Sequence, residues 1–261
     1  MSAPRPLALI TGGWRRLGAA IARRLASDGW DLALHAHHAE SFDTAFADEL
    51  RSAGAVVFAV AGDLRDAPCA AGLVGQVGAM AGRVPVLLVN CASIFHDDTI
   101  ATLSLAALDE HFRTNLFAPL VLTRAFADAL GTDALDRDGP RGSVVHILDQ
   151  RVINPVPDQL SYGLSKQALH ASVRTLARAL APRVRVNGVA PGLILPTDDY
   201  DEAQWRRLAG IMPLQHLPAD RDIADAVAFL STAQSVTGQT IFVDAGANLE
   251  AYPRDFVYLE R

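Results

Sequence analysis

The chain has 261 residues, half of them hydrophobic, and a formal net charge of −6 at pH 7. This composition predicts a folded α/β protein with a sizeable core, in one large domain or two small ones. An acidic balance without a long basic run argues against a nucleic-acid partner. Cys69 and Cys91 lack metal-site or disulfide-framework spacing, and no apolar run fits a signal peptide or a membrane span. We therefore expect no metal, no membrane and a cytoplasmic location.

Short apolar runs alternate along the chain with longer amphipathic ones. The apolar runs cover residues 6–11, 31–35, 55–60, 85–90, 143–148, 183–189 and 240–244. Their unbroken hydrophobicity is typical of strands that are covered on both faces. Helical spacing covers residues 17–29, 42–54, 73–82, 108–130 and 164–181. This alternation, without a composition break, predicts a single domain (1–261) built on a doubly wound parallel sheet of about seven strands.

Two segments interrupt the alternation. Residues 131–142 are rich in charge and glycine and predict a solvated loop. Residues 193–220 follow a predicted strand and carry Tyr200 and Trp205. Ligands of an open α/β sheet bind at the carboxyl ends of its strands, so 193–220 is predicted to be a substrate loop.

The first predicted strand runs into the sequence TGGWRRLG at residues 11–18. A strand, a glycine turn and a helix present backbone N–H groups and a helix N-terminus to a pyrophosphate. Gly12 would permit the sharp turn, and Gly18 the close approach of helix and sheet. Arg16 stands where the usual dinucleotide fingerprint has its middle glycine. Taken alone, the motif leaves open an ordinary turn with a surface arginine.

The end of the second predicted strand indicates which dinucleotide would bind. An NAD site normally places an acid there for the ribose 2′-hydroxyl, but this strand ends in HAHHAES. His37 and His38 stand in that place, and Arg15 and Arg16 lie across the turn. Positive groups attract a 2′-phosphate that a carboxylate would repel, so NADP(H) is expected. Simple surface histidines remain the alternative, for His38 in particular.

An acid, a phenol and an amine follow in the sequence LDQRVINPVPDQLSYGLSK at residues 148–166. Tyr162 and Lys166 are four residues apart near a helix start, hence on one face, and Asp149 closes the preceding strand. The lysine charge would lower the pKa of the phenol, which could then pass protons. Asp149 is either a catalytic acid kept protonated by burial or a structural partner of Arg151. Its place at a strand end in a cofactor cleft favours catalysis.

The order of these motifs resembles the short-chain dehydrogenase/reductase family, from Leu7 to about Gly246. The matching pieces are TGGWRRLG, GDL at 62–64, LVNCAS at 88–93, TNLFAPL at 114–120, YGLSK at 162–166 and RVNGVAPG at 185–192. The resemblance implies a Rossmann-type oxidoreductase, a homotetramer, and catalysis by Asn115, Tyr162 and Lys166, with Asp149 in place of the family's serine. The expected cofactor contacts are Gly12, Arg15, Arg16, Leu17, Gly18, His37, His38, Asp63, Leu64, Cys91, Ala92, Ser93, Tyr162, Lys166, Pro191 and Gly192.

The departures from the family pattern resemble its pteridine reductase branch, which includes bacterial dihydromonapterin reductases. These are Arg16 for glycine, the HxH after the second strand and Asp149 for serine. In that branch an aromatic residue at the position of Phe95 stacks the pterin over the nicotinamide. The implied substrate contacts are Arg16, Ser93, Phe95, Asp149 and Tyr162.

A pterin gives the aspartate a task that a ketone does not. The ring nitrogen of a C=N bond must receive a proton as hydride arrives at carbon, and a carboxylic acid could deliver it. The sequence therefore predicts NADPH-dependent reduction of a dihydropterin or dihydrofolate. Two alternatives stay open: a carbonyl reductase for oxo-acyl or ketone substrates, and a non-enzymatic NADP-binding regulator. The aromatic-rich end at 251–261 is a candidate for packing on a neighbouring subunit.

Overall fold

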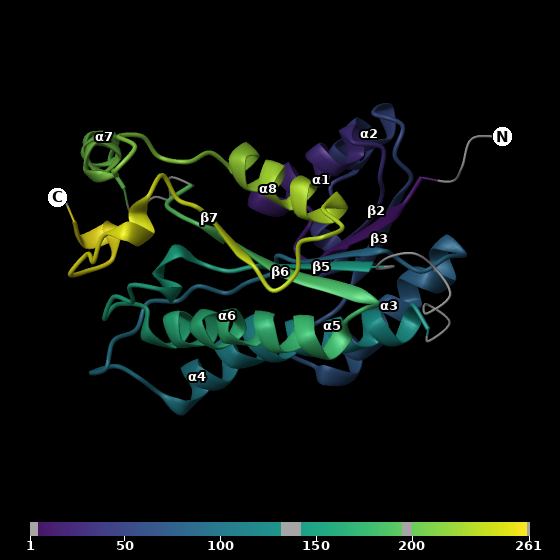
Figure 1. Ribbon diagram of the computed structural model, residues 1–261, viewed down its shortest axis with the longest axis horizontal. Coiled ribbons are helices and arrows are strands. Elements are labelled where there is room, and N and C mark those ends of the chain that lie inside the picture. The colour runs from purple at the N-terminus through teal and green to yellow at the C-terminus, as the bar shows by residue number, and fades with distance from the viewer. Residues whose placement is uncertain (1–4, 132–141, 195–199, 260–261) are drawn as a thin grey trace.

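The computed structural model describes residues 5–131, 142–194 and 200–259. Within them seven strands form one parallel sheet in the order β3-β2-β1-β4-β5-β6-β7 (Figure 1). The strands are β1 (Leu7–Ile10), β2 (Asp31–Ala36), β3 (Val57–Ala61), β4 (Leu87–Asn90), β5 (Gly142–Ile147), β6 (Val184–Pro191) and β7 (Thr240–Val243). The predicted doubly wound sheet is confirmed. Most of the predicted loop at 131–142 and residues 195–199 of the predicted substrate loop lie outside the described residues.

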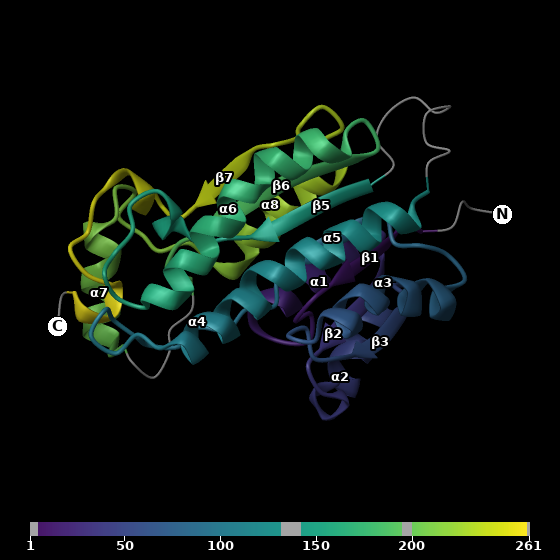
Figure 2. The same ribbon diagram turned by 90° about the horizontal axis from the view of Figure 1, so that it is seen from below.

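Helices cover both faces of the sheet (Figures 1 and 2). One face carries α1 (Arg16–Ser27), α2 (Thr44–Ser52) and α8 (Asp220–Thr232), and the other carries α3 (Ala67–Ala81), α4 (Leu105–Phe112), α5 (Ala118–Ala129) and α6 (Leu160–Leu180). Successive strand residues point to opposite faces, so Ile10 packs in the α1–α8 core while Leu9 packs in the α3–α5 core. Both side chains are fully buried, which explains why the strands are hydrophobic without alternation.

Two helical features differ from the sequence prediction. The helix expected at 108–130 is divided by a π-helical turn, Arg113–Phe117, which holds Asn115. Single π turns inside α-helices occur frequently at functional sites. Helix α8 was not predicted, although Ile223, Val227 and Leu230 bury one face of it at helical spacing. Helix α7 (Glu202–Ile211) forms within the predicted substrate loop.

The C-terminal segment, residues 250–259, packs against its own chain beside α7 (Figure 2). The ring of Tyr252 lies 5.1 Å from that of Phe256, and its hydroxyl donates to the carbonyl oxygen of Ile211 at 3.3 Å. Gln204 of α7 donates to the carbonyl oxygen of Leu259 at 2.7 Å. These contacts place the segment at the carboxyl edge of the sheet, where the candidate site lies.

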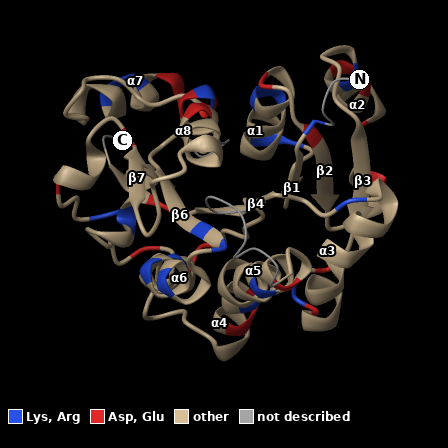
Figure 3. Cartoon of the chain, turned by 45° about the vertical axis from the view of Figure 1, so that its right-hand side comes forward, with Lys and Arg blue, Asp and Glu red and all other residues tan. Residues whose placement is uncertain are grey.

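Charged residues of both signs are interspersed over the helices and loops in the view of Figure 3, rather than gathered into one basic face. In the part of the chain that the structure describes, no helix is long and apolar enough to cross a membrane. The same residues contain no group of three or more histidine, cysteine, aspartate or glutamate side chains arranged to hold a metal ion.

Candidate active site

A cavity of about 1150 Å³ follows the carboxyl edge of the sheet. The strand order changes direction between β1 and β4, so the loops after these strands diverge and leave a crevice between them. The cavity extends from the glycine turn after β1, past the ends of β4, β5 and β6, to residues 255–258. It collects nearly all the residues that the sequence predicted for cofactor and substrate. His38 and Asn115 do not line it.

The glycine turn has the geometry that dinucleotide binding requires. Gly12 has φ +64°, and a Cβ there would lie 3.1 Å from the Cα of Ala92. A Cβ on Gly18 would lie 2.1 Å from the carbonyl oxygen of Gly12, so helix α1 can approach the turn only through a glycine. The hydroxyl of Thr11 accepts the N–H groups of Cys91 and Ala92 at 2.9 and 3.0 Å. These two hydrogen bonds connect the turn to the loop after β4.

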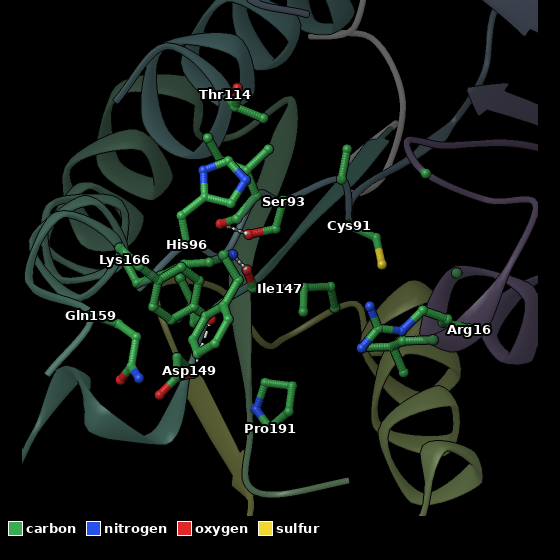
Figure 4. Close-up of a pocket in the computed structure, with 18 of the residues that line it drawn as sticks. Arg16, Cys91, Ser93, His96, Thr114, Ile147, Asp149, Gln159, Lys166 and Pro191 are labelled. Carbon is green, nitrogen blue, oxygen red and sulfur yellow. Dashed lines mark hydrogen bonds between the residues drawn. The ribbon is translucent and has the colours of Figure 1, made fainter. Parts of the chain in front are cut away.

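Arg16 adopts the backbone conformation of the glycine that it replaces. Its φ is +52°, in the left-handed region, which costs a residue with a side chain about 1–3 kcal/mol. The backbone of the turn is therefore kept while a guanidinium is added to the cavity wall. Figure 4 shows Arg16 on the opposite side of the cavity from Lys166 and Asp149, with Pro191 between them. A direct contact of Arg16 with Asp149 is not part of this arrangement.

Three predicted side chains meet around the end of the second strand. His37 lines the cavity, with its Nδ1 3.6 Å from an Asp63 oxygen. The His38 ring lies 3.9 Å from the His37 ring but outside the cavity wall, which favours the surface-histidine interpretation for His38. Hydrogen bonds from Arg65 lower the pKa of Asp63, which stays anionic. Arg65 also lines the cavity, and the sequence analysis missed it although it directly follows the GDL motif.

His35, a second residue that the sequence analysis missed, supports the glycine turn through hydrogen bonds. Its Nε2 is 2.9 Å from the carbonyl oxygen of Gly62, and its Nδ1 accepts the N–H of Gly12 at 3.4 Å. Burial lowers its pKa, so the ring is neutral at physiological pH. The bonds connect the β1 and β3 loops, and the histidine therefore fixes the turn rather than binding a phosphate.

Tyr162 and Lys166 are both buried on one face of α6, as predicted. Lys166 Nζ donates to the carbonyl oxygen of Ile147 at 2.8 Å and lies 5.7 Å from the centroid of the tyrosine ring. The Tyr162 hydroxyl donates to Asp149 Oδ2 at 2.9 Å. The acid, the phenol and the amine thus converge at one place, 13 and 4 residues apart in sequence.

Asp149 is paired with Arg151 as well as with Tyr162. The guanidinium donates to both carboxylate oxygens, at 3.0 and 3.1 Å, and the Arg151 N–H adds a bond of 2.8 Å. Burial opposes ionisation of Asp149, but the charge and hydrogen bonds of Arg151 outweigh it and lower the pKa. The expectation of a protonated Asp149 with a raised pKa is therefore wrong for the protein alone. The ion pair with Arg151 is present, as the structural interpretation expected, and a catalytic role for Asp149 stays a prediction.

The phenol also differs from expectation. Burial, followed by the negative charge of Asp149, raises the pKa of Tyr162 well above its ordinary value. Burial lowers the pKa of Lys166 to about 8, against the charges of Asp149 and Cys91. The prediction that Lys166 lowers the pKa of the phenol is wrong because desolvation and Asp149 dominate. Tyr162 keeps its proton and shares it with Asp149 as one coupled pair.

Asn115 holds loops together rather than facing the cavity. Its Nδ2 donates to the carbonyl oxygen of Ile94 at 3.0 Å and to the Ser165 hydroxyl at 3.1 Å. Its Oδ1 accepts the Ile94 N–H at 3.0 Å and the Ser93 hydroxyl at 3.1 Å. The amide therefore joins α6 to the loop after β4, which carries Phe95.

Phe95 presents an aromatic ring to the end of the cavity that holds Tyr162 and Asp149. The residue is 52% exposed, whereas Tyr162 beside it is buried. The ring meets Tyr162 edge-on, with centroids 4.7 Å apart, and the Arg151 guanidinium lies 5.5 Å from its centroid. An exposed ring in a cavity beside a proton-carrying pair provides a surface for stacking a planar heterocycle.

Comparison with known proteins identifies the family. The short chain dehydrogenase family model matches residues 6–206, and the chain belongs to that family of oxidoreductases. It is similar to pteridine reductase 1 of Leishmania tarentolae, with 29% identity over 94% of this chain and 96% of the relative. It is also similar to the 3-oxoacyl-[acyl-carrier-protein] reductase FabG of Staphylococcus aureus, with 30% identity over 92% and 96%.

Among solved structures, the chain resembles FolM alternative dihydrofolate reductase 1 of Brucella canis, crystallised with NADP. The TM-score is 0.81 and the identity 38%, covering 94% of this chain and 95% of that one. The predicted resemblance to a pteridine reductase-like branch of the family is confirmed. Relatives that reduce oxoacyl groups are equally present, so family membership leaves the substrate open.

Proposed function

We propose that the protein reduces a dihydropterin, or a related dihydrofolate, with NADPH. The observation that carries this proposal is the hydrogen-bonded Asp149–Tyr162 pair beside the exposed ring of Phe95. A planar pterin fits against an aromatic ring, and a ring nitrogen needs a proton donor next to it. The similarity to pteridine reductase 1 and to FolM supports the same substrate class.

The residues of the glycine turn fit NADP(H), the cofactor of the FolM crystal structure. The glycine turn at Gly12 and Gly18 would hold the pyrophosphate end, and Arg15, Arg16 and His37 would provide donors for a 2′-phosphate. When bound, NADPH supplies the hydride. Lys166, whose Nζ lies 5.7 Å from the Tyr162 ring, would bind the nicotinamide ribose.

The choice of cofactor is testable with a matched pair of histidine variants. His37 lines the cavity and His38 does not. We expect His37→Ala to reduce the preference for NADPH over NADH, measured as a ratio of kcat/KM, by about tenfold, the worth of one hydrogen bond to a charged group. His38→Ala should leave the ratio unchanged. Equal ratios in the wild type and the His37 variant would assign the phosphate to the arginines alone.

The chain's own residues would move a single proton. Tyr162 and Asp149 share it across 2.9 Å, and the pair releases it to the substrate nitrogen as hydride arrives at the neighbouring carbon. Arg151 fixes the carboxylate in a single orientation through three hydrogen bonds. Tyr162, which carried the proton in this hydrogen bond, then regains one from solvent.

One observation favours a carbonyl substrate instead. Because Arg151 keeps Asp149 ionised, the Tyr162 hydroxyl is a neutral donor of the kind that a carbonyl oxygen requires. The FabG similarity agrees with this second candidate, an oxo-acyl or ketone reductase. The assembled pair makes a non-enzymatic regulator the weakest of the three interpretations.

The test is NADPH oxidation against dihydromonapterin, dihydrobiopterin, dihydrofolate, an acetoacetyl thioester and an activated diketone. The proposal expects kcat/KM for a dihydropterin to exceed that for the carbonyl compounds by at least about tenfold, with Tyr162→Phe as the inactive control. The reverse order would establish the carbonyl reductase. We further propose a homo-oligomer, with a tetramer implied by the family resemblance, a cytoplasmic location, and 193–220 as the substrate loop.

A further inference from the structure

The C-terminal segment brings a second carboxylate to Arg151, the arginine that is paired with Asp149. Asp255 Oδ2 accepts a hydrogen bond from Arg151 Nη1, on the side of the guanidinium away from Asp149. Both partners are largely buried, with 11% of the Arg151 side chain and 8% of the Asp255 side chain exposed. A single cation therefore lies between two acids that are 106 residues apart, Asp149 and Asp255.

Contacts outside the catalytic pair hold Asp255 in this place. Arg254 binds both oxygens of the buried Asp158 carboxylate, with Nε donating to Oδ2 at 2.8 Å and Nη2 donating to Oδ1 at 2.7 Å. The Asp255 N–H donates to the same carboxylate at 2.8 Å. Tyr258 donates to Asp97 at 3.2 Å and adds a further attachment of the segment. These contacts hold Asp255 in position independently of its ion pair with Arg151.

Arg151 attracts both acids, but the net pKa shifts of the two acids have opposite directions. Burial raises the pKa of Asp255 against the attraction of Arg151, and Asp149 and Asp158 raise it further. Arg151 lowers the pKa of Asp149. The titratable and charged groups around Asp149 come from several elements packed together. Arg151 follows β5, Tyr162 and Lys166 belong to α6, and Asp255 belongs to the C-terminal segment. Cys91 lies next to Lys166, and Asp158 lies next to Asp255.

We propose that Asp255 is a positioning residue that weakens the electrostatic attraction of Arg151 for Asp149. It thereby sets the pH range in which the Asp149–Tyr162 pair keeps its proton. The inference rests on the proposed function only in using that pair as the proton source. Asp255 acts through Arg151 and touches no reacting atom. The C-terminal segment is then part of the active site of its own chain.

The test is the pH profile of single-turnover NADPH oxidation in Asp255→Asn. Removing a negative charge near Asp149 favours its ionised form, so the alkaline limb should move by about one unit to lower pH. Rates above that limb should fall about tenfold and recover at lower pH. Asp255→Glu should restore the wild-type limb, and the Kd for NADPH should stay unchanged. Asp255→Ser provides a second neutral variant if the Asp255→Asn protein does not fold.

Arg254→Gln is the matched control, because it loosens the segment without changing the charge on Arg151. It should raise KM or lower the thermal midpoint but leave the limb in place. An unmoved limb in the neutral Asp255 variants, or an equal shift in Arg254→Gln, would overturn the inference. Each variant is measured with a dihydropterin and with a diketone. A shifted limb on the diketone alone would refute the pterin proposal and leave the role of Asp255 standing.

Discussion

Substitution of Asp149 by asparagine or serine separates the two candidate functions. Asparagine keeps the size of the side chain but cannot pass a proton, and its amide has one acceptor oxygen where the carboxylate has two. Serine restores the residue that the family usually has at this position, and its hydroxyl suits a carbonyl oxygen better than a ring nitrogen. Both variants should therefore lose dihydropterin reduction, and the serine variant should keep or gain weak activity on activated diketones.

The contacts of Asp149 set the size of these effects. Three of its hydrogen bonds come from Arg151, at 2.8, 3.0 and 3.1 Å, and one comes from Tyr162, at 2.9 Å. Breaking a buried ion pair by removing one partner costs about 3–5 kcal/mol. Asp255 still compensates Arg151, so a loss near the lower limit, about 3 kcal/mol, is expected. Loss of general acid–base catalysis should reduce the rate by about 10²–10⁴.

Single-turnover NADPH oxidation and chemical denaturation measure the two quantities on the same preparations. The rate loss must exceed any loss of NADPH binding, which fluorescence titration measures independently. Reduction of a dihydropterin by Asp149→Asn at the wild-type rate would refute the reasoning. The carboxylate would then be structural, the pterin proposal would lose its chemical basis, and the carbonyl reductase would replace it.

Three further variants examine other parts of the site. Tyr162→Phe should keep the fold and lower turnover by about 10²–10⁴, so near-normal turnover would show that the phenol carries no proton. Gly18→Ala should weaken NADPH binding and destabilise the protein by about 1–3 kcal/mol, since its Cβ would meet the Gly12 carbonyl. Gly72→Ala, with open space around its Cβ, should be neutral or slightly stabilising. Because burial lowers the pKa of Lys166 from 10.5 to about 8, the unfolded chain binds that proton more tightly between these values. Wild-type stability should therefore rise by up to about 3 kcal/mol from pH 8 to 10.5 relative to Lys166→Met, and parallel curves would contradict the burial of a charged lysine.

The sheet and the positions of the motifs could be predicted because both depend on local patterns. Unbroken apolar runs predicted the strands. Because each motif follows a strand, all the motifs meet at the carboxyl edge of the sheet. Helix α8 carried a signal of the same kind in Ile223, Val227 and Leu230, and it was overlooked. The left-handed backbone of Arg16 carries no such signal, because an arginine at that position ordinarily indicates a right-handed one.

The electrostatics of the catalytic pair could not be predicted from spacing. The sequence placed Asp149 in a buried cleft, and burial alone would raise its pKa. Which effect wins depends on whether Arg151 points toward the carboxylate, and that depends on packing against Phe95 and Tyr162. Asp255 comes from the far end of the chain, where no local pattern connects it to the site. Asp149, Tyr162 and Lys166 were predicted from the sequence, but Asp255 and the electrostatic balance between these groups were not.

An acid in the family's serine position requires compensation, and the structure supplies it in steps. A buried Asp149 is tolerable only beside a cation, which Arg151 provides from two residues away. A buried arginine with Lys166 nearby would leave an excess of positive charge, and Asp255 removes it. With Lys166 protonated, the two acids and two bases sum to no net charge. The pairing of Asp149 with Arg151 and Asp255, rather than Asp149 alone, is therefore the feature that distinguishes this active site from one built on serine.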